Sequence, residues 1–269
     1  MSTPAQLWQY RTLISNLTRR DLKAKYRKSI LGQLWSLVSP ASTLAIYTLI
    51  FGVVFKTQAP LAGNGTTTSF ALYLFTALVI WNFFSAGVNA SIDGLQGAGP
   101  LLNKIYFPPE GPVLAVIAGV LVQLGFEFAI LVLINAIVGN LSWTFLLFPL
   151  LLIPLVAFTL GFGMIASILN IFYRDVRYLI GIVLQLLFYM TPIVYQIEMI
   201  PEEFHGFPAR DIFALNPIVE FVDTARSLFY LHEVPSAFDI AYMWAISAAM
   251  LGIGWWYFAR RAAQAVEEL

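Results

Sequence analysis

The sequence predicts an all-α integral membrane protein with six transmembrane helices, and three observations lead to this fold class. Of the 269 residues, 59% are hydrophobic and only 11% are charged, whereas soluble domains carry about 25% charged residues. The apolar residues form six runs long enough to cross a bilayer, and most Lys and Arg residues lie between alternate runs. We expect one transmembrane domain over residues 1–269, with an amphipathic interfacial helix at its start and short external helices between spans five and six.

Each apolar run predicts a helix, because lipid offers no hydrogen-bond partner to free backbone groups. About 20 residues rising 1.5 Å each cross a hydrocarbon layer of about 30 Å. Gly163 with Ser167, and Ala248 with Gly252, are small residues one turn apart and predict close contact between spans. The predicted spans are 31–55, 70–92, 112–138, 143–171, 178–197 and 238–259.

The distribution of Lys and Arg predicts that both chain termini are cytoplasmic. With this orientation, twelve basic residues lie in cytoplasmic segments, and only Lys56, Arg210 and Arg226 lie outside. Such a bias is the one that the positive-inside rule describes. The formal net charge is zero, so the overall charge gives no indication of nucleic-acid binding.

Residues 1–28 predict an amphipathic helix followed by a basic cluster. Thr3, Pro4 and Gln6 have the order of a helix N-cap, a first-turn proline and the far end of a capping box. The apolar residues then recur at helical spacing, at Leu7, Tyr10, Ile14 and Leu17. This pattern suits the anionic cytoplasmic membrane surface, and it equally suits packing against a soluble partner.

The external segment 198–237 contains a second amphipathic helix, which begins at Asn216 and Pro217. Its polar residues, including Arg226, lie off an apolar stripe. About 15 residues reach only about 22 Å, so we expect this helix to lie on the outer face or to dip into the membrane against protein. The stripe comprises Ile218, Phe221, Val222, Ala225 and Leu228.

No motif predicts a catalytic, nucleotide-binding or metal site on this chain. There is no cysteine, and His205 and His232 lack ligand spacing. The glycines before Lys104 lack the Gly-Lys-Ser/Thr order of a phosphate-binding loop. The acidic residues of the external segment are compatible with a membrane glycosyltransferase, although a solvated loop explains them with fewer assumptions. We expect neither cofactor nor metal here.

Glu127 is an acidic residue near the middle of the third predicted span. An ionised carboxylate there costs at least about 2.5–3.5 kcal/mol, and Gln123, one turn earlier, is placed to share a hydrogen bond with it. Two interpretations stay open: a pore-lining or switching group, or a polar contact between helices. With one such acid and no evident internal repeat, an ion-coupled secondary transporter is the weaker alternative.

Aromatic residues make up 15% of the chain and cluster on faces of three predicted spans. Such faces suit a path for sugars, whose apolar C–H faces stack on rings, and they equally suit lipid contact or helix packing. The candidates for a substrate path are Tyr47, Phe51, Phe55, Trp81, Phe84, Phe188, Tyr189 and Tyr195.

Four stretches together resemble the membrane subunits of ABC exporters for cell-surface polysaccharides, the O-antigen, teichoic-acid and capsule exporters. They lie in this order over most of the chain, and within the family they look most like actinobacterial exporters of lipid-linked galactan. The stretches are 26–35 with Pro40 and 51–55, then 101–110, then 173–177 with 184–195, and finally 215–217 with Arg226.

The resemblance implies a homodimer of six-span subunits in the inner (plasma) membrane, with two separate ATP-binding cassette subunits that carry ATP and Mg²⁺. It implies export of a lipid-linked polysaccharide from the cytoplasmic side, and no enzymatic activity on this chain. Two sets of residues acquire expected roles. Contact with the ATPase is expected at Leu7, Tyr10, Lys104, Tyr106, Phe107, Pro108 and Glu110, and an external gate at Asn216, Pro217, Phe221 and Arg226.

Overall fold

A computed structural model describes residues 8–25, 35–57, 59–102, 104, 107–203 and 208–269. All regular structure in these ranges is helical, which confirms the predicted all-α membrane protein. Five helical segments are long and apolar enough to cross a membrane, and α8 (Val176–Met190) is a shorter apolar helix. The five are Leu37–Val54, Phe70–Gly97, Glu110–Ile137, Trp143–Phe172 and Ala237–Glu267.

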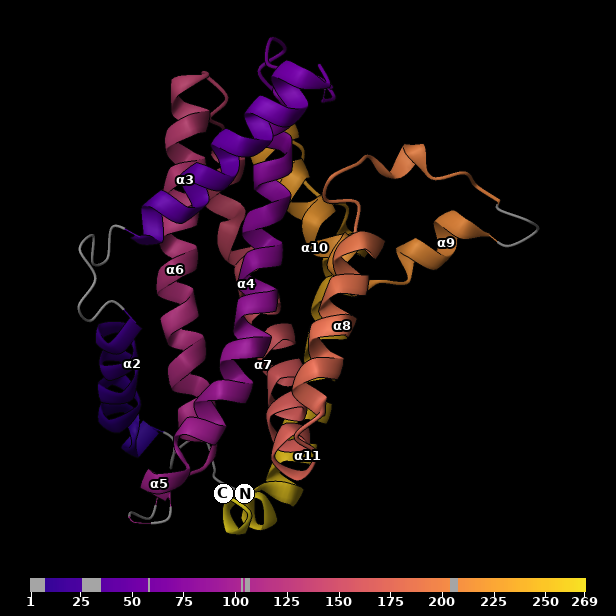
Figure 1. Cartoon of the computed structure of the whole chain (residues 1–269). Coiled ribbons are helices and arrows are strands. Elements are labelled where there is room, and N and C mark those ends of the chain that lie inside the picture. The colour runs from indigo at the N-terminus through magenta and orange to yellow at the C-terminus, as the bar shows by residue number, and fades with distance from the viewer. Residues whose placement is uncertain (1–7, 26–34, 58, 103, 105–106, 204–207) are drawn as a thin grey trace.

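The helix α4 (Phe70–Gly97) forms the centre of the bundle, and nearly every side chain in its first half is buried. It begins at Ser69, whose hydroxyl accepts a hydrogen bond from the Leu72 amide. Around it stand α6 (Glu110–Ile137), α7 (Phe148–Phe172) and α8 (Figure 1). At one end, the end of α4 and the short α5 (Gly99–Leu102) lie near the chain's C-terminus (Figure 1); we call this the α5 end.

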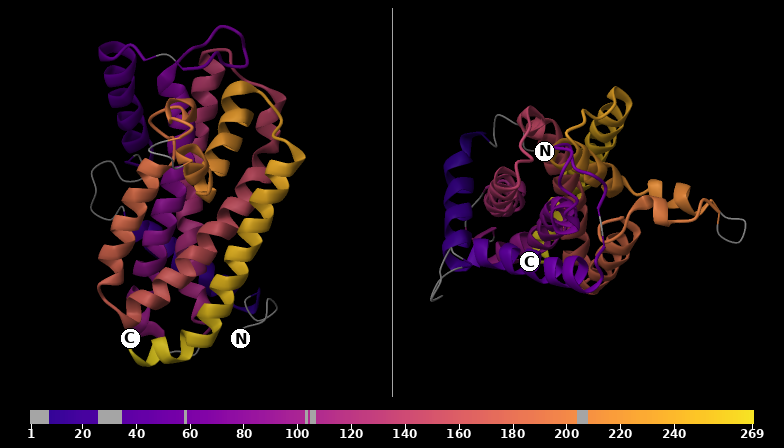
Figure 2. Two further views of the ribbon diagram at one scale, coloured as in Figure 1. Left: turned by 90° about the vertical axis from the view of Figure 1, so that its right-hand side faces the viewer. Right: turned by 90° about the horizontal axis from the view of Figure 1, so that it is seen from above.

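The first span lies across the outside of the bundle rather than within it. It consists of α3 (Trp35–Tyr47) and the π-helical η2 (Thr48–Val54). Seen from above, it runs past α4 and α6 towards α8 (Figure 2). Its outward side chains are exposed, at 57% for Ile46 and 67% for Val53, so this face requires lipid or another protein surface.

The helices α7 and α11 (Ala237–Glu267) approach each other through backbone contact at glycines. A Cβ atom added to Gly161 would overlap the Met250 carbonyl oxygen, and one added to Gly254 would overlap the Gly161 carbonyl oxygen. Gly252 of α11, which the spacing of small residues had singled out, has open space around it, so the contact with α7 is made at Gly254. Gly163 does make a close contact, with Ser91 of α4. The axial register of α7 and α11 selects which glycines meet.

The helix α8 ends at Met190, seven residues earlier than the predicted end of the fifth span at 197. Pro192 disfavours a helical conformation at the residue before it, and Thr191 is accordingly extended. The chain then leaves the bundle, and α9 (Ala209–Ala214) projects away from it (Figure 1).

The chain returns in α10 (Pro217–Arg226), which packs on α4 with its apolar stripe inward. Ile218, Phe221 and Val222 are at most 1% exposed, so the stripe is confirmed as a buried face. Arg226 was expected off the stripe, yet it is only 3% exposed. Its guanidinium carbon lies 3.8 Å from the ring centroid of Tyr73, and its Nη2 donates to the Ile193 carbonyl at 3.0 Å. The aromatic ring and the carbonyl stabilise the buried cation.

The helix α2 (Arg11–Lys25) packs against the first turns of α6 at the α5 end. Leu17 is buried with Phe107 and Ala115, and the Thr18 hydroxyl donates to the Ala115 carbonyl at 2.9 Å. Tyr10 packs on the same cluster. The apolar stripe of this helix therefore faces its own chain.

Candidate functional site

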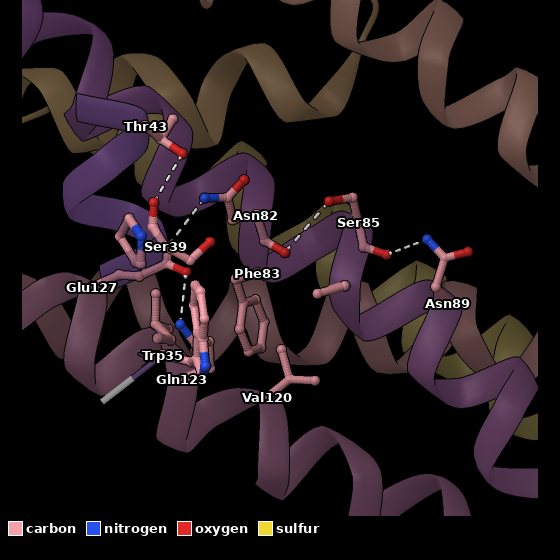
Figure 3. Close-up of a pocket in the computed structure, with 13 residues that line it drawn as sticks. Trp35, Ser39, Thr43, Asn82, Phe83, Ser85, Asn89, Val120, Gln123 and Glu127 are labelled. Carbon is pink, nitrogen blue, oxygen red and sulfur yellow. Dashed lines mark hydrogen bonds between the residues drawn. The ribbon is translucent and has the colours of Figure 1, made fainter. Parts of the chain in front are cut away.

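A polar cavity of about 600 Å³ lies between α3, α4 and α6 (Figure 3). Side chains with amide, hydroxyl or carboxylate groups make up about half of its wall, although each contributing helix belongs to an apolar span. It is lined by Trp35, Ser39, Pro40, Thr43, Asn82, Phe83, Ser85, Ala86, Asn89, Val120, Gln123, Leu124 and Glu127.

Glu127 lies in this cavity and is 5% exposed. Both of its carboxylate oxygens accept hydrogen bonds: Oε1 from Gln123 Nε2 at 3.3 Å and Oε2 from Asn82 Nδ2 at 3.2 Å (Figure 3). The bond to Gln123 confirms the contact that helical spacing predicted. Asn82 was not predicted as a partner, because it comes from a different helix 45 residues away.

Polar residues of α4 form a stripe along the helix that ends at the α5 end. Asn82, Ser85, Asn89 and Asp93 recur every three or four residues, which places them on one helical face. The Ser85 hydroxyl donates to the Asn82 carbonyl at 3.4 Å, and Asn89 Nδ2 donates to the Ser85 carbonyl at 2.8 Å. Their spacing within an otherwise apolar span was a signal available in the sequence.

A second cavity of about 360 Å³ continues from the first towards the α5 end. Asn89 and Gln123 line both cavities, and the second one extends to Asp21 and Asp93. Arg177 pairs with Asp93 through Nη1 and Nη2, each of which donates to one carboxylate oxygen. Because both side chains are about half exposed, this pair contributes little stability.

An aromatic groove of about 300 Å³ lies on the other flank of α4, against α8. Trp81 and Phe188 meet there edge to face with ring centroids 5.4 Å apart, beside Tyr189. The Tyr195 hydroxyl donates to the Tyr189 carbonyl at 2.5 Å. Phe84 contacts Trp81 edge to face, with ring centroids 5.9 Å apart, but it does not line the groove: it is 1% exposed and packs on Phe158 and Phe162 in the core.

The aromatic residues of the first span form a separate ladder away from the α5 end. Tyr47 stacks on Phe51 at 5.8 Å between centroids, and Phe51 contacts Phe55 at 5.7 Å and Phe70 at 5.2 Å. Phe55 is 65% exposed. The predicted aromatic candidates thus fall into a groove, a ladder and one core position.

Those residues expected to contact an ATPase that the structure describes lie where α2 meets the start of α6. Phe107 is buried beside Tyr10, Lys104 is exposed and Pro108 is half-buried. Glu110 begins α6 and is 4% exposed, and within the described part of the chain its Oε2 accepts no hydrogen bond. Leu7 and Tyr106 lie outside the described residues.

The expected external gate residues join α10 to the chain that follows α8. The Asn216 side chain accepts from the Ile218 amide at 3.1 Å and donates to the Thr191 hydroxyl at 2.8 Å. Pro217 follows as the first helical residue, and Phe221 is buried.

Glu220 lies on the outer face of α10 and is about half-buried. Burial raises the pKa of this carboxyl, and the nearby charges of Asp239 and Asp223 raise it further. A hydrogen bond from the Thr224 hydroxyl, at 3.5 Å, acts in the opposite direction.

Comparison with known proteins gives consistent similarities. A family model described as "ABC-2 type transporter" matches residues 12–230. The chain is 29% identical over 248 residues to an O-antigen export system permease protein of Myxococcus xanthus, covering 91% of each. It is 31% identical to a protein of the same description from Klebsiella pneumoniae, over 81% of this chain and 80% of the relative. A polysialic acid transport protein of Escherichia coli is 22% identical over 90% of each.

Proposed function

Because this chain belongs to the ABC-2 type transporter family, we propose that it is the membrane-spanning subunit of an ATP-driven polysaccharide exporter. The observation that carries the proposal is the similarity to O-antigen export permeases, which extends over 91% of both chains in one case. The polysialic acid transport protein, similar over 90% of its length, also has a sugar polymer in its name. We propose a lipid-linked polysaccharide as the substrate.

ATP hydrolysis is assigned in this proposal to a separate ATP-binding cassette chain, which carries ATP and Mg²⁺. Two copies of each chain make up the transporter. The α5 end faces the cytoplasm, which agrees with the twelve-to-three distribution of basic residues. The docked helix α2 and the exposed Lys104 then offer a cytoplasmic surface through which the ATPase can act.

The aromatic groove and the ladder are assigned to the polymer path. Rings such as Trp81 and Tyr189 present flat apolar faces to sugars, while the exposed faces of α3 and α8 border the space that a second copy would enclose. Binding along such a path must stay weak at each site, because a polymer that is held tightly cannot advance. Stacking on successive rings meets this requirement better than a single deep pocket does.

The proposal is tested by deleting the gene for this chain in a polysaccharide-producing cell. We expect the polymer to disappear from the cell surface, measured with a specific lectin or antibody, and to accumulate inside as lipid-linked material. Inactivating the partner ATPase should have the same effect. Normal surface polymer in both strains would contradict the proposal. Turnover of a sugar donor by the purified chain without any ATPase would favour a glycosyltransferase instead.

A further inference from the structure

Two short π-helices lie at the end of the bundle opposite the α5 end. The first is η2 (Thr48–Val54), which completes the first span, and the second is η5 (Ser227–Leu231), which continues α10. Each is followed by a residue with a left-handed backbone, Lys56 with a φ of 52° and His232 with a φ of 63°. Within the described ranges, these are the two residues other than glycine that have a positive φ. The conformation is strained for a residue that carries a Cβ atom.

The two π-helices are closed by the same kind of hydrogen bond. The Thr57 amide donates to the Phe51 carbonyl, and the Glu233 amide donates to the Ser227 carbonyl, each at 2.8 Å and across six residues. Strained backbone persists only where its surroundings hold it in place. The contacts around each closure therefore decide how firmly it is fixed.

The contacts around η5 fix its conformation. Tyr230 is fully buried, and its carbonyl accepts hydrogen bonds from the Gly63 amide at 2.9 Å and from Asn140 Nδ2 at 3.2 Å. His232 Nε2 lies 2.9 Å from the Asn140 carbonyl oxygen. Two other loops therefore hold both the π-helix and the strained residue after it.

The same closure at η2 has much less support. All seven residues of η2 are described and none is buried, and the side chains at 53–55 are between 62% and 67% exposed. Lys56 is exposed as well. The ring of Phe51 contacts that of Phe70 in α4, with centroids 5.2 Å apart. A strained conformation with so little packing around it is poised to change.

We propose that η2 is a conformational switch, which changes from π-helical to α-helical hydrogen bonding during the transport cycle and releases the strain at Lys56. The inference rests on the proposed function, because it assigns the change to a transport cycle. In this arrangement η5 is the fixed partner and η2 is the part that moves.

The sequence of η2 explains why the two bonding patterns lie close in free energy. The Thr48 hydroxyl donates to the Leu44 carbonyl at 2.7 Å, and such a bond competes with the backbone ladder and bends helices. Gly52 lies in the middle of the segment and weakens a helix interior relative to alanine. The local sequence therefore gives regular α-helical bonding no strong advantage here.

The change in η2 reaches the aromatic ladder of the proposed polymer path. A π-helix closes its hydrogen bonds over five residues and an α-helix over four, so the change removes one residue from a turn. An α-helix has 3.6 residues per turn, so the chain beyond that point turns by about 100° about the helix axis. Phe55, now 5.7 Å from Phe51 between ring centroids, turns away from it, while Tyr47 lies before η2 and keeps its place. The switch thus opens the ladder at its outer end.

The variants Lys56→Gly and Lys56→Ala test the switch. Ala keeps the Cβ atom and its strain, whereas Gly removes both, so Gly should stabilise the π-helical state. The full-length chain is reconstituted in lipid vesicles with its ATPase partner and carries a polarity-sensitive fluorophore at Val54→Cys, since the natural chain has no cysteine. We expect the emission to differ between the ATP-free transporter and one trapped with ATP and vanadate. The ratio of switched to unswitched chains should be about 5–30 times lower for Lys56→Gly than for Lys56→Ala, the factor that about 1–2 kcal/mol corresponds to.

The control is the same fluorophore at Ile46→Cys, which is exposed on α3 before the switch and should give the same emission in both states. Size-exclusion profiles show that each variant is assembled. Three results would overturn the inference and leave the proposed function intact: unchanged emission at position 54 in a transporter that exports polymer with ATP, equal changes in the Gly and Ala backgrounds, or an equal change at position 46. Absence of ATP-driven export would overturn both.

Discussion

Single polar residues in this bundle are stabilised by partners on other helices or loops. Asn140 Nδ2 donates both to Asn135 Oδ1 at 2.9 Å and to the Tyr230 carbonyl at 3.2 Å. The Thr144 hydroxyl donates to the Leu228 carbonyl at 2.5 Å. A buried donor that loses its acceptor costs about 1–3 kcal/mol. Substitutions at such positions should therefore lower the free energy of unfolding by more than their small volume changes suggest.

Glu127 allows this expectation to be measured. Replacement by Leu removes the acceptor of the Asn82 and Gln123 amides, so we expect a loss of about 1–3 kcal/mol for each donor left without a partner. Glu127→Gln keeps one acceptor oxygen without the cost of a charge and should remain close to the wild type. Thermal unfolding of the purified subunit, followed by fluorescence-detected size exclusion, compares the two. A Leu variant as stable as the wild type would contradict the hydrogen-bonding role.

Glu220 should make stability depend on pH. The pKa of Glu220 in the folded chain is raised above its ordinary value of 4.5. At a pH between the ordinary and the raised pKa, the folded chain therefore binds more protons than the unfolded chain. Stability is then lost as the pH rises through the raised pKa. We expect Glu220→Gln to increase the melting temperature at neutral pH and to have no such advantage below pH 4.5. Glu267→Gln, at an exposed position of α11, is the matched control and should show no such crossover.

At the scale of the elements, the close approach of α7 and α11 depends on glycines, because a Cβ atom would not fit between the two backbones. Gly254→Ala places a methyl group against the backbone of Gly161, whereas Gly252→Ala adds the same group in open space. Overpacking of this kind costs about 1–3 kcal/mol. We expect a clear fall in the melting temperature for Gly254→Ala and little change for Gly252→Ala. Equal effects of the two variants would mean that the helices do not meet in this register.

At the scale of the whole molecule, the proposed orientation assigns the α5 end to the cytoplasm. Single cysteines are informative because the natural chain has none. A membrane-impermeant reagent should label Thr66→Cys in intact cells, and should label Lys104→Cys and Ala263→Cys only after permeabilisation. All three positions are exposed, so differences in labelling report the side of the membrane. External labelling at position 104 would contradict both the orientation and the proposed ATPase contact.

The sequence by itself determined the fold class, five of the membrane-crossing helices and the inward stripe of α10. Each follows from local properties: apolar length, helical periodicity and the need to satisfy backbone groups in lipid. It also placed Gln123 beside Glu127, since both belong to one helix. The early end of α8 also has a cause that is local in sequence, because Thr191 precedes Pro192.

Only the tertiary structure decided which helices meet and at what height. It brought Asn82 to Glu127 across 45 residues, buried Arg226 over Tyr73, and chose Gly254 rather than Gly252 for contact with α7. It also divided the aromatic candidates, with Phe84 in the core and Trp81 in the groove. Periodicity defines the faces of a helix but carries no information on its rotation and axial shift relative to a neighbour. Those depend on the fit of side chains from distant parts of the chain.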